Sequence, residues 1–186
     1  MSLDASNVRV AVTGAVYTDP AGSATAPTGT ASTLTGFDDL GYVSEDGITL
    51  AFPDAGDSTP IKVWQNGATV RTVRSSSDEL PTLALTLVET KLEVIETVFG
   101  VSVTQTATEG EFVIDSTSTR SGAPLVLDVI DGDELIRVYA PSAVVTSIGE
   151  INLTSTDAIG YNVTLELEHN QTLGGNAKVW MTALKS

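Results

Sequence analysis

The amino-acid sequence predicts a mainly β fold with a single helix laid against it. Most of the 186-residue chain alternates apolar and polar residues with period two, which is strand spacing. Val, Thr, Ile, Gly and Ser dominate the composition, as in sheets joined by turns. There is no internal repeat and no linker composition. We therefore expect one domain over residues 1–186, with about ten strands.

The one helix is expected at residues 91–99. Thr90, followed three positions later by a glutamate, matches a capping box that would start this helix. Gly100 can adopt the left-handed conformation that ends a helix. The residues just before the helix alternate as in a strand, so the hydrophobic period changes from two to about 3.6 here. The apolar stripe of the helix is formed by Leu92, Ile95 and Phe99.

A hairpin around Asn66-Gly67 is the strongest local prediction, because both residues tolerate positive φ and lie between alternating runs. The preceding segment, 53–60, reads as a loop. Another hairpin is expected around Asp131-Gly132-Asp133, and Pro141 is expected to open a new segment after it. The expected strands are 7–16, one through Ile48 and Leu50, 61–65, 68–74, 83–88, 101–106, 111–115, 125–130, 134–140, 159–168 and 178–182.

Residues 17–41 are rich in Ala, Thr, Gly and Pro and show no periodicity. A structureless loop of that length is uncommon in a compact domain. Two interpretations remain open at this point: a floppy loop, or an arm that orders on a neighbouring subunit. Leu34, Phe37 and Leu40 favour the arm, since a solvated linker rarely needs such side chains.

The charge and the residue types exclude several classes of function. The 24 acidic and 9 basic residues give a formal net charge of −15, which argues against a grip on nucleic-acid phosphates. The chain has no cysteine, so it forms no disulfide and no thiolate metal site. It has no apolar run near the roughly 20 residues that span a bilayer, and its start does not resemble a signal peptide.

No catalytic, cofactor or metal site is expected. The only histidine is His169, and the sequence has no glycine-flanked serine that it could activate as a general base. The acidic turns at 54–57 and 131–134 lack the alternating ligands and distal glutamate of a calcium loop. An all-β carbohydrate- or surface-binding module is the alternative function. Its only aromatic set is Trp64, Tyr139, Tyr161 and Trp180.

Six segments in this order and spacing resemble the major tail (tail tube) proteins of long-tailed siphophages, especially those that infect actinobacteria. No single motif is specific, but the combination is, and it covers the chain from about Asn7 to Trp180. The segments are GYVSEDGITL at 41–50, IKVWQNGATVRTV at 61–73, LVETKLEVIETVFG at 87–100, PLVLDVIDGDELIRVYAPSAVVTS at 124–147, GYNVTLELEHN at 160–170 and GGNAKVW at 174–180.

The resemblance implies two packed antiparallel sheets, as a β-sandwich or half-barrel flanked by the helix. It also implies six-membered rings stacked into a non-contractile tube, which carries genomic DNA from capsid to host without binding it specifically. The tube would polymerise on a tape-measure protein, between a tail terminator and the baseplate or distal tail proteins. We expect assembly in the host cytoplasm, a place in the virion, and no additional immunoglobulin-like domain at the C-terminus.

The resemblance also suggests where subunits meet and which residues face the lumen. A long early loop in such folds reaches the adjacent ring; by position this role falls to 17–41, with 53–60 as second choice. An acidic lumen wall would repel DNA phosphates over a screening length of about 8 Å. The contact candidates are Tyr17, Leu34, Phe37, Leu40, Pro53 and Asp57. The lumen-facing candidates, chosen because they alternate outward from the core face, are Glu111, Asp115, Glu166 and Glu168, and an exterior position of either pair is the open alternative.

Overall fold

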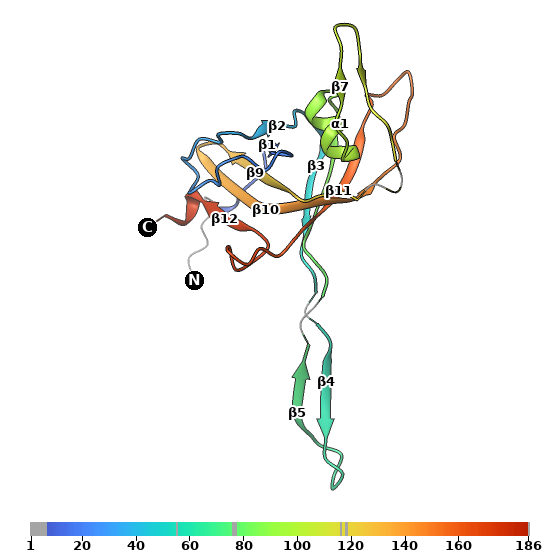
Figure 1. The fold of residues 1–186 in the computed structure, drawn as a ribbon. Helices are drawn as coiled ribbons and strands as arrows, with labels where there is room; N and C mark the ends of the chain where they lie inside the picture. Colours follow the sequence, from blue (N-terminus) through green and yellow to red (C-terminus); the bar gives the residue numbers. More distant parts are fainter. Residues whose placement is uncertain (1–6, 55, 76–77, 116, 118, 186) are drawn as a thin grey trace.

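The computed structural model describes residues 7–54, 56–75, 78–115, 117 and 119–185. Its largest element is an eight-stranded antiparallel sheet in the order β2-β1-β9-β10-β11-β6-β3, with β12 also paired to β10 (Figure 1). The mainly β prediction is thereby confirmed. The sheet consists of β1 (Thr13–Thr18), β2 (Asp38–Asp39), β3 (Val43–Ala51), β6 (Thr82–Leu87), β9 (Ala123–Asp131), β10 (Glu134–Ile148), β11 (Tyr161–Leu167) and β12 (Lys178–Met181).

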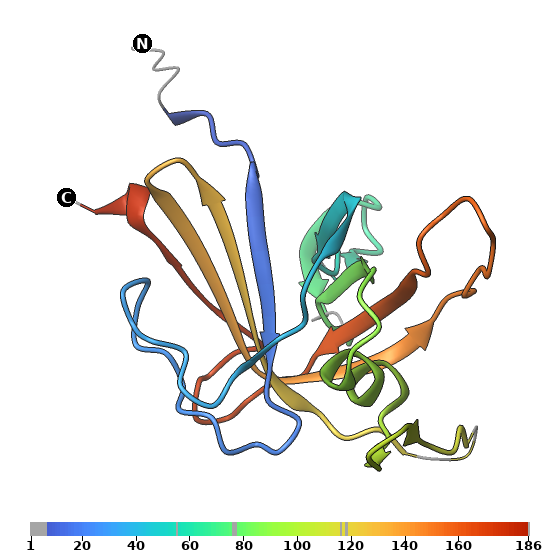
Figure 2. The same ribbon diagram turned by 90° about the horizontal axis from the view of Figure 1, so that it is seen from above.

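Strand β10 belongs to both halves of this sheet, which meet at an angle along it (Figure 2). Its first part pairs with β9 and β12, and its second part pairs with β11. The pairing with β9 shifts between Ala140 and Ala143, on either side of Pro141. Proline has no N–H to donate and is tolerated at such a bulge. The expectation that the strand would end before Pro141 is therefore wrong: the strand continues through it.

The core lies between the two halves, as in a sandwich. Alternate residues point inward, so Val163, Leu165 and Leu167 of β11 are buried while the residues between them are not. The other half contributes in the same way. Its buried inward residues are Val16, Leu125, Leu127, Val138 and Ala140.

Helix α1 (Leu92–Phe99) closes this core, one residue shorter than predicted. Its buried face consists of Val94, Ile95 and Val98, so the apolar stripe is rotated from the predicted one. Gly100 ends the helix at φ 65°, ψ 36°, as predicted. The prediction of a capping box is wrong, because no side chain caps the helix. The Thr90 hydroxyl instead lies 3.0 Å from the Tyr161 hydroxyl.

The N-terminal strand is shorter than expected. It begins at Thr13 rather than Asn7, although the Val12 N–H still donates to the Ile130 carbonyl at 3.2 Å. The valines at positions 8, 10 and 12 remain exposed. An apolar alternation predicts a buried face only where a second layer covers it, and here no described element does.

Two small ribbons complete the fold. β7 (Thr104–Gln105) pairs with β8 (Gly110–Glu111), so the predicted strands at 101–106 and 111–115 are reduced to two residues each. β4 (Ser58–Lys62) pairs with β5 (Thr69–Arg74) and forms the hairpin predicted around Asn66-Gly67. This β4–β5 hairpin projects far from the body of the subunit (Figure 1).

Candidate assembly surfaces

The β4–β5 hairpin is the longest fully exposed element in the described part of the subunit. Every residue of both strands is exposed, and Trp64 at the tip is 95 % exposed. A two-stranded hairpin is at best marginally stable alone in water, and this one has no second layer beneath it. Exposed apolar side chains on such an element indicate a contact with another molecule. Those side chains are Ile61, Trp64, Val70 and Val73.

The hairpin also has the opposite charge to the rest of the chain. Residues 58–75 contain Lys62, Arg71 and Arg74, and no Asp or Glu. The remaining six basic and 24 acidic residues leave the rest of the chain with a formal charge of −18. A basic projection on an acidic body makes one copy electrostatically complementary to another.

The outer face of β3, β6 and β11 is polar and lined with small side chains. Register places Thr49, Ala84 and Thr164 side by side across the three strands, and Glu166 opposite Thr82. Glu45 and Asp46 of β3 are exposed at the register shift before Ile48, and Glu166 is the only charged residue among the outward residues that the register pairs on this face. They are Thr49, Ala51, Thr82, Ala84, Thr86, Asn162, Thr164 and Glu166.

The outer face of the other half of the sheet is covered by residues 19–37. Arg137 on β10 forms a two-pronged ion pair with Asp128 on β9, with both N···O distances 2.7 Å. The same guanidinium donates to the carbonyls of Gly29 and Ser32 at 3.0 and 2.8 Å. These bonds tie the loop to the sheet. Hydrogen bonding to Asp128 raises the pKa of Arg137, so the cation persists despite its burial.

The contact candidates within 17–41 consequently contact the subunit's own sheet. Leu40 is 2 % exposed and belongs to the hydrophobic core. Phe37 meets Tyr139 edge to face at 6.5 Å, and Leu34 and Tyr17 are half-buried. Burial, and secondarily the nearby carboxylates of Asp39 and Asp128, raise the pKa of Tyr17.

The other two contact candidates lie at the root of the β4–β5 hairpin. Pro53 is half-buried and Asp57 is exposed. The Asp57 carbonyl accepts the N–H of Ser75 at 3.0 Å, which brings the two chain segments together where the hairpin begins. Sequence reasoning ranked this region second. The absence of acidic residues from 58–75 is a sequence signal that this ranking did not use.

A comparison with protein families now identifies the chain. The model of the family described as "Phage tail tube protein" matches residues 1–183. The chain belongs to the phage tail tube protein family. A search of curated proteins returned no significant match. The family is structural and non-enzymatic, so the prediction of a non-enzymatic tail tube subunit is confirmed, and its members form a homo-oligomeric tube in the virion tail.

The four carboxylates predicted for the lumen of this tail tube subunit lie in two places. Glu166 is on the polar outer face, half-buried, and Glu168 follows the end of β11, where its carboxylate accepts the Ser142 hydroxyl at 2.6 Å. Glu111 is in the short β7–β8 ribbon. Asp115 is exposed beyond that ribbon, and hydrogen bonds from the backbone and side chain of Thr117 lower its pKa.

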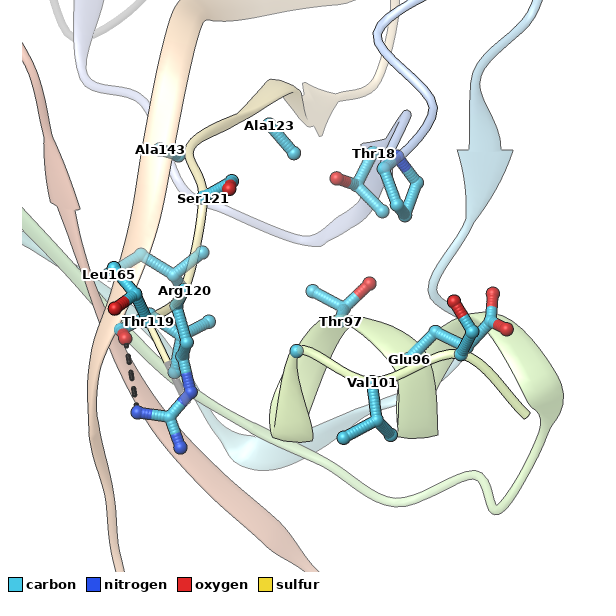
Figure 3. A pocket seen from close by; sticks show the side chains of 14 residues that line it. Thr18, Glu96, Thr97, Val101, Thr119, Arg120, Ser121, Ala123, Ala143 and Leu165 are labelled. Atoms are coloured by element: carbon cyan, nitrogen blue, oxygen red, sulfur yellow. Dashed lines mark hydrogen bonds between the residues drawn. The ribbon is translucent and has the colours of Figure 1, made fainter. Parts of the chain in front are cut away.

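A pocket lies between the C-terminal end of α1 and residues 119–123 of the tail tube subunit (Figure 3). Its volume is about 220 Å³, and hydroxyl groups and Arg120 line it. Glu96, on its wall, accepts the N–H of Val103 at 2.9 Å and is already occupied. No histidine lines the pocket, and His169 is exposed after β11, so no hydroxyl there has a histidine beside it.

The aromatic set of the alternative function does not form a row. Tyr161 is buried in the core, and Tyr139 lies against Phe37 under the loop. Trp180 is half-buried with the Lys178 ammonium 5.1 Å above its ring, and Trp64 is at the hairpin tip. Within the described residues, no group of acidic or histidine side chains could hold a metal ion, and no helix is long and apolar enough to cross a membrane.

Proposed function

We propose that this chain is the repeating subunit of the tube of a long, non-contractile siphophage tail, in which six-membered rings stack around a channel for DNA. The observation that carries this proposal is the β4–β5 hairpin. An apolar-tipped, basic arm on an acidic body is unsatisfied in one copy and complementary to the next. Repeated head-to-tail contact between unlike surfaces produces an open polymer.

The hairpin, rather than residues 17–41, is the arm that reaches the adjacent ring in this proposal. Residues 19–37 are held by Arg137 over their own sheet, whereas the hairpin makes no such contact. Pro53 and Asp57, at its root, then lie close to the boundary between rings. Tyr17, Leu34, Phe37 and Leu40 act mainly inside the subunit.

The polar outer face of β3, β6 and β11 lines the channel in this proposal. Its central residues Thr49, Ala84 and Thr164 are exposed or half-buried, and Glu166 has no Lys or Arg among the residues that the register pairs on this face. β3 is at the end of the sheet, so its outer edge is open to pair with a neighbouring subunit and close a barrel. Of the other lumen candidates, Glu168 lies at the end of this face, while Glu111 lies on the exposed β7–β8 ribbon and Asp115 lies beyond it.

The finer biological setting rests on the sequence resemblance. It comprises a phage of actinobacteria, assembly in the host cytoplasm on a tape-measure protein, and capping by a tail terminator and by baseplate or distal tail proteins. Genomic DNA passes through the channel, and the net negative charge of the chain supports sliding rather than adhesion.

The test is negative-stain electron microscopy of the purified protein at increasing concentration. We expect rings or tubes from the natural sequence. A matched variant replaces residues 58–74 by Asn-Gly, which can bridge the bonded pair Asp57 and Ser75 as a two-residue turn. This variant should keep the circular dichroism of the β fold and remain monomeric. A natural chain that stays monomeric at every concentration would overturn the proposal.

A further inference from the structure

An apolar pocket lies between β9, β10, β12 and the residues that precede β1. Val129, Ile136 and Met181 stand side by side across β9, β10 and β12 and line it. Residues 9–11, before β1, line it as well, and the pocket is partly open to solvent. Its volume is about 260 Å³, and a pocket of roughly 150 Å³ with apolar walls already binds benzene. The pocket therefore has room for an aromatic side chain.

The rim of this pocket is acidic. Asp131 and Glu134 line it, and Asp133 is exposed in the turn between them. Arg9 is the one basic residue in the lining and pairs with Glu134 at 3.8 Å. A partner that combines an apolar anchor with positive charge fits such a rim.

The tip of the β4–β5 hairpin has both properties. Trp64 is 95 % exposed, Lys62 is two residues before it, and Arg71 lies across the ribbon, opposite Ile61. A few anchor residues buried in pockets dominate the energy of protein interfaces, and Trp is one of the residue types enriched among them. The exposed indole of Trp64 on a projecting hairpin is suited to be the anchor of such a contact.

We infer that Trp64 of one copy inserts into the pocket lined by Val129, Ile136 and Met181 of a second copy. Trp64 cannot reach the pocket of its own subunit. The hairpin continues from β3 and β6 at one end of the sheet and projects away from it, while β1, β9 and β12 are at the other end (Figures 1 and 2). The contact joins unlike surfaces and so repeats along a polymer. The inference rests on the proposed function. It identifies the contact between Trp64 and this pocket as the inter-ring lock, the interaction that holds adjacent rings together.

The chain has no natural cysteine, so disulfide trapping tests this contact cleanly. Gln65→Cys leaves Trp64 in place, and Ala183→Cys labels the pocket rim. Mixing the two single variants and oxidising them should give a disulfide-linked dimer, and the double variant should give a ladder on a non-reducing gel. The control partner is Ala107→Cys, in the turn of the β7–β8 ribbon, which should give little product with Gln65→Cys.

Trp64→Ala should raise the critical concentration for tube formation at least tenfold, as expected for loss of an interface anchor, while Thr72→Ala on the same hairpin should not. Tubes that form normally from Trp64→Ala, or cross-links no stronger at position 183 than at 107, would overturn the lock and leave the tube intact. Preferred cross-linking of Ala183→Cys to Ser2→Cys within one chain would assign the pocket to the chain's own N-terminus and also overturn it. Failure of the natural sequence to form tubes would instead overturn the proposed function.

Discussion

Arg137 is the residue on which the two layers of one half of the subunit depend. It is 5 % exposed, and its partner Asp128 is also buried. A charged pair is costly to bury, and removing one member leaves the other without compensation. Here the guanidinium also satisfies two loop carbonyls, so the pair organises residues 19–37 as well as neutralising itself.

Asp128→Asn should therefore lower the free energy of unfolding by about 3–5 kcal/mol, because it leaves the Arg137 cation buried without an anionic partner. The double variant Asp128→Leu with Arg137→Met should recover most of that loss. It should nevertheless make residues 19–37 more sensitive to proteolysis, since the Gly29 and Ser32 carbonyls lose their donor. Urea unfolding and limited proteolysis measure the two effects. A single variant as stable as the natural chain would contradict the account.

Two tyrosines predict how stability responds to alkaline pH. Burial raises the pKa of Tyr17 and of Tyr139 above the ordinary value of 10.0. The unfolded chain then loses these protons first, so the free energy of unfolding is unaffected below about pH 10 and falls as pH rises above it. Tyr17→Phe should flatten this alkaline fall, whereas Tyr42→Phe, at an exposed ring, should not. If the free energy of unfolding falls equally steeply with alkaline pH in the two variants, the assigned burial of Tyr17 is wrong.

Among the elements, those with a strong local signal could be predicted from sequence. Residues 91–99 and 159–168 match α1 and β11 to within two residues, because their periodicity is carried by many large apolar residues. The capping box failed because the Thr90 hydroxyl found a tertiary partner in Tyr161, which local sequence does not contain. The hairpin at Asn66-Gly67 was predictable, but its projection was not, since alternation does not reveal whether a second layer covers either face.

Gly100 gives a direct test of the helix end. Its φ of 65° disfavours any residue with a Cβ, and a Cβ there would lie 3.0 Å from the Arg120 side chain. Gly100→Ala should lower the free energy of unfolding by about 1–2 kcal/mol. Gly132→Ala, at φ 60° with nothing within 4 Å, is the matched control for the backbone cost alone. Thermal unfolding should show Gly100→Ala to be at least as destabilising as Gly132→Ala; a neutral Gly100→Ala would contradict the assigned cap.

The charge of the hairpin makes a separate prediction about assembly. Reversing Lys62, Arg71 and Arg74 to glutamate should abolish tubes while changing the free energy of unfolding by less than about 0.5 kcal/mol, because all three side chains are exposed. The control exchanges Lys62 for Arg and both arginines for Lys, which keeps the charge. Sedimentation should show that the reversed variant is monomeric and that the charge-preserving control assembles. If the reversed variant assembled at the same concentration as the natural sequence, the positive charge of the hairpin would not contribute to assembly.

At the scale of the whole molecule, the sequence resemblance predicted the fold class and the family, whereas the surfaces needed the structure. Residues 17–41 looked like an arm because they lack periodicity, yet Arg137, more than 100 positions away, binds them. Such long-range contacts leave no local pattern. Glu166 and Glu111 likewise look equivalent as alternating carboxylates, and only the sheet register separates the polar face from the exposed ribbon.

A helical reconstruction of the assembled tube by electron cryomicroscopy tests the central claim most directly. The account predicts that the hairpin Ser58–Arg74 of each subunit lies on a subunit of the next ring, and that the outer face of β3, β6 and β11, with Glu166, lines the channel. Hairpins that extend into solvent without contacting another copy, or a channel lined by the face under residues 19–37, would contradict it.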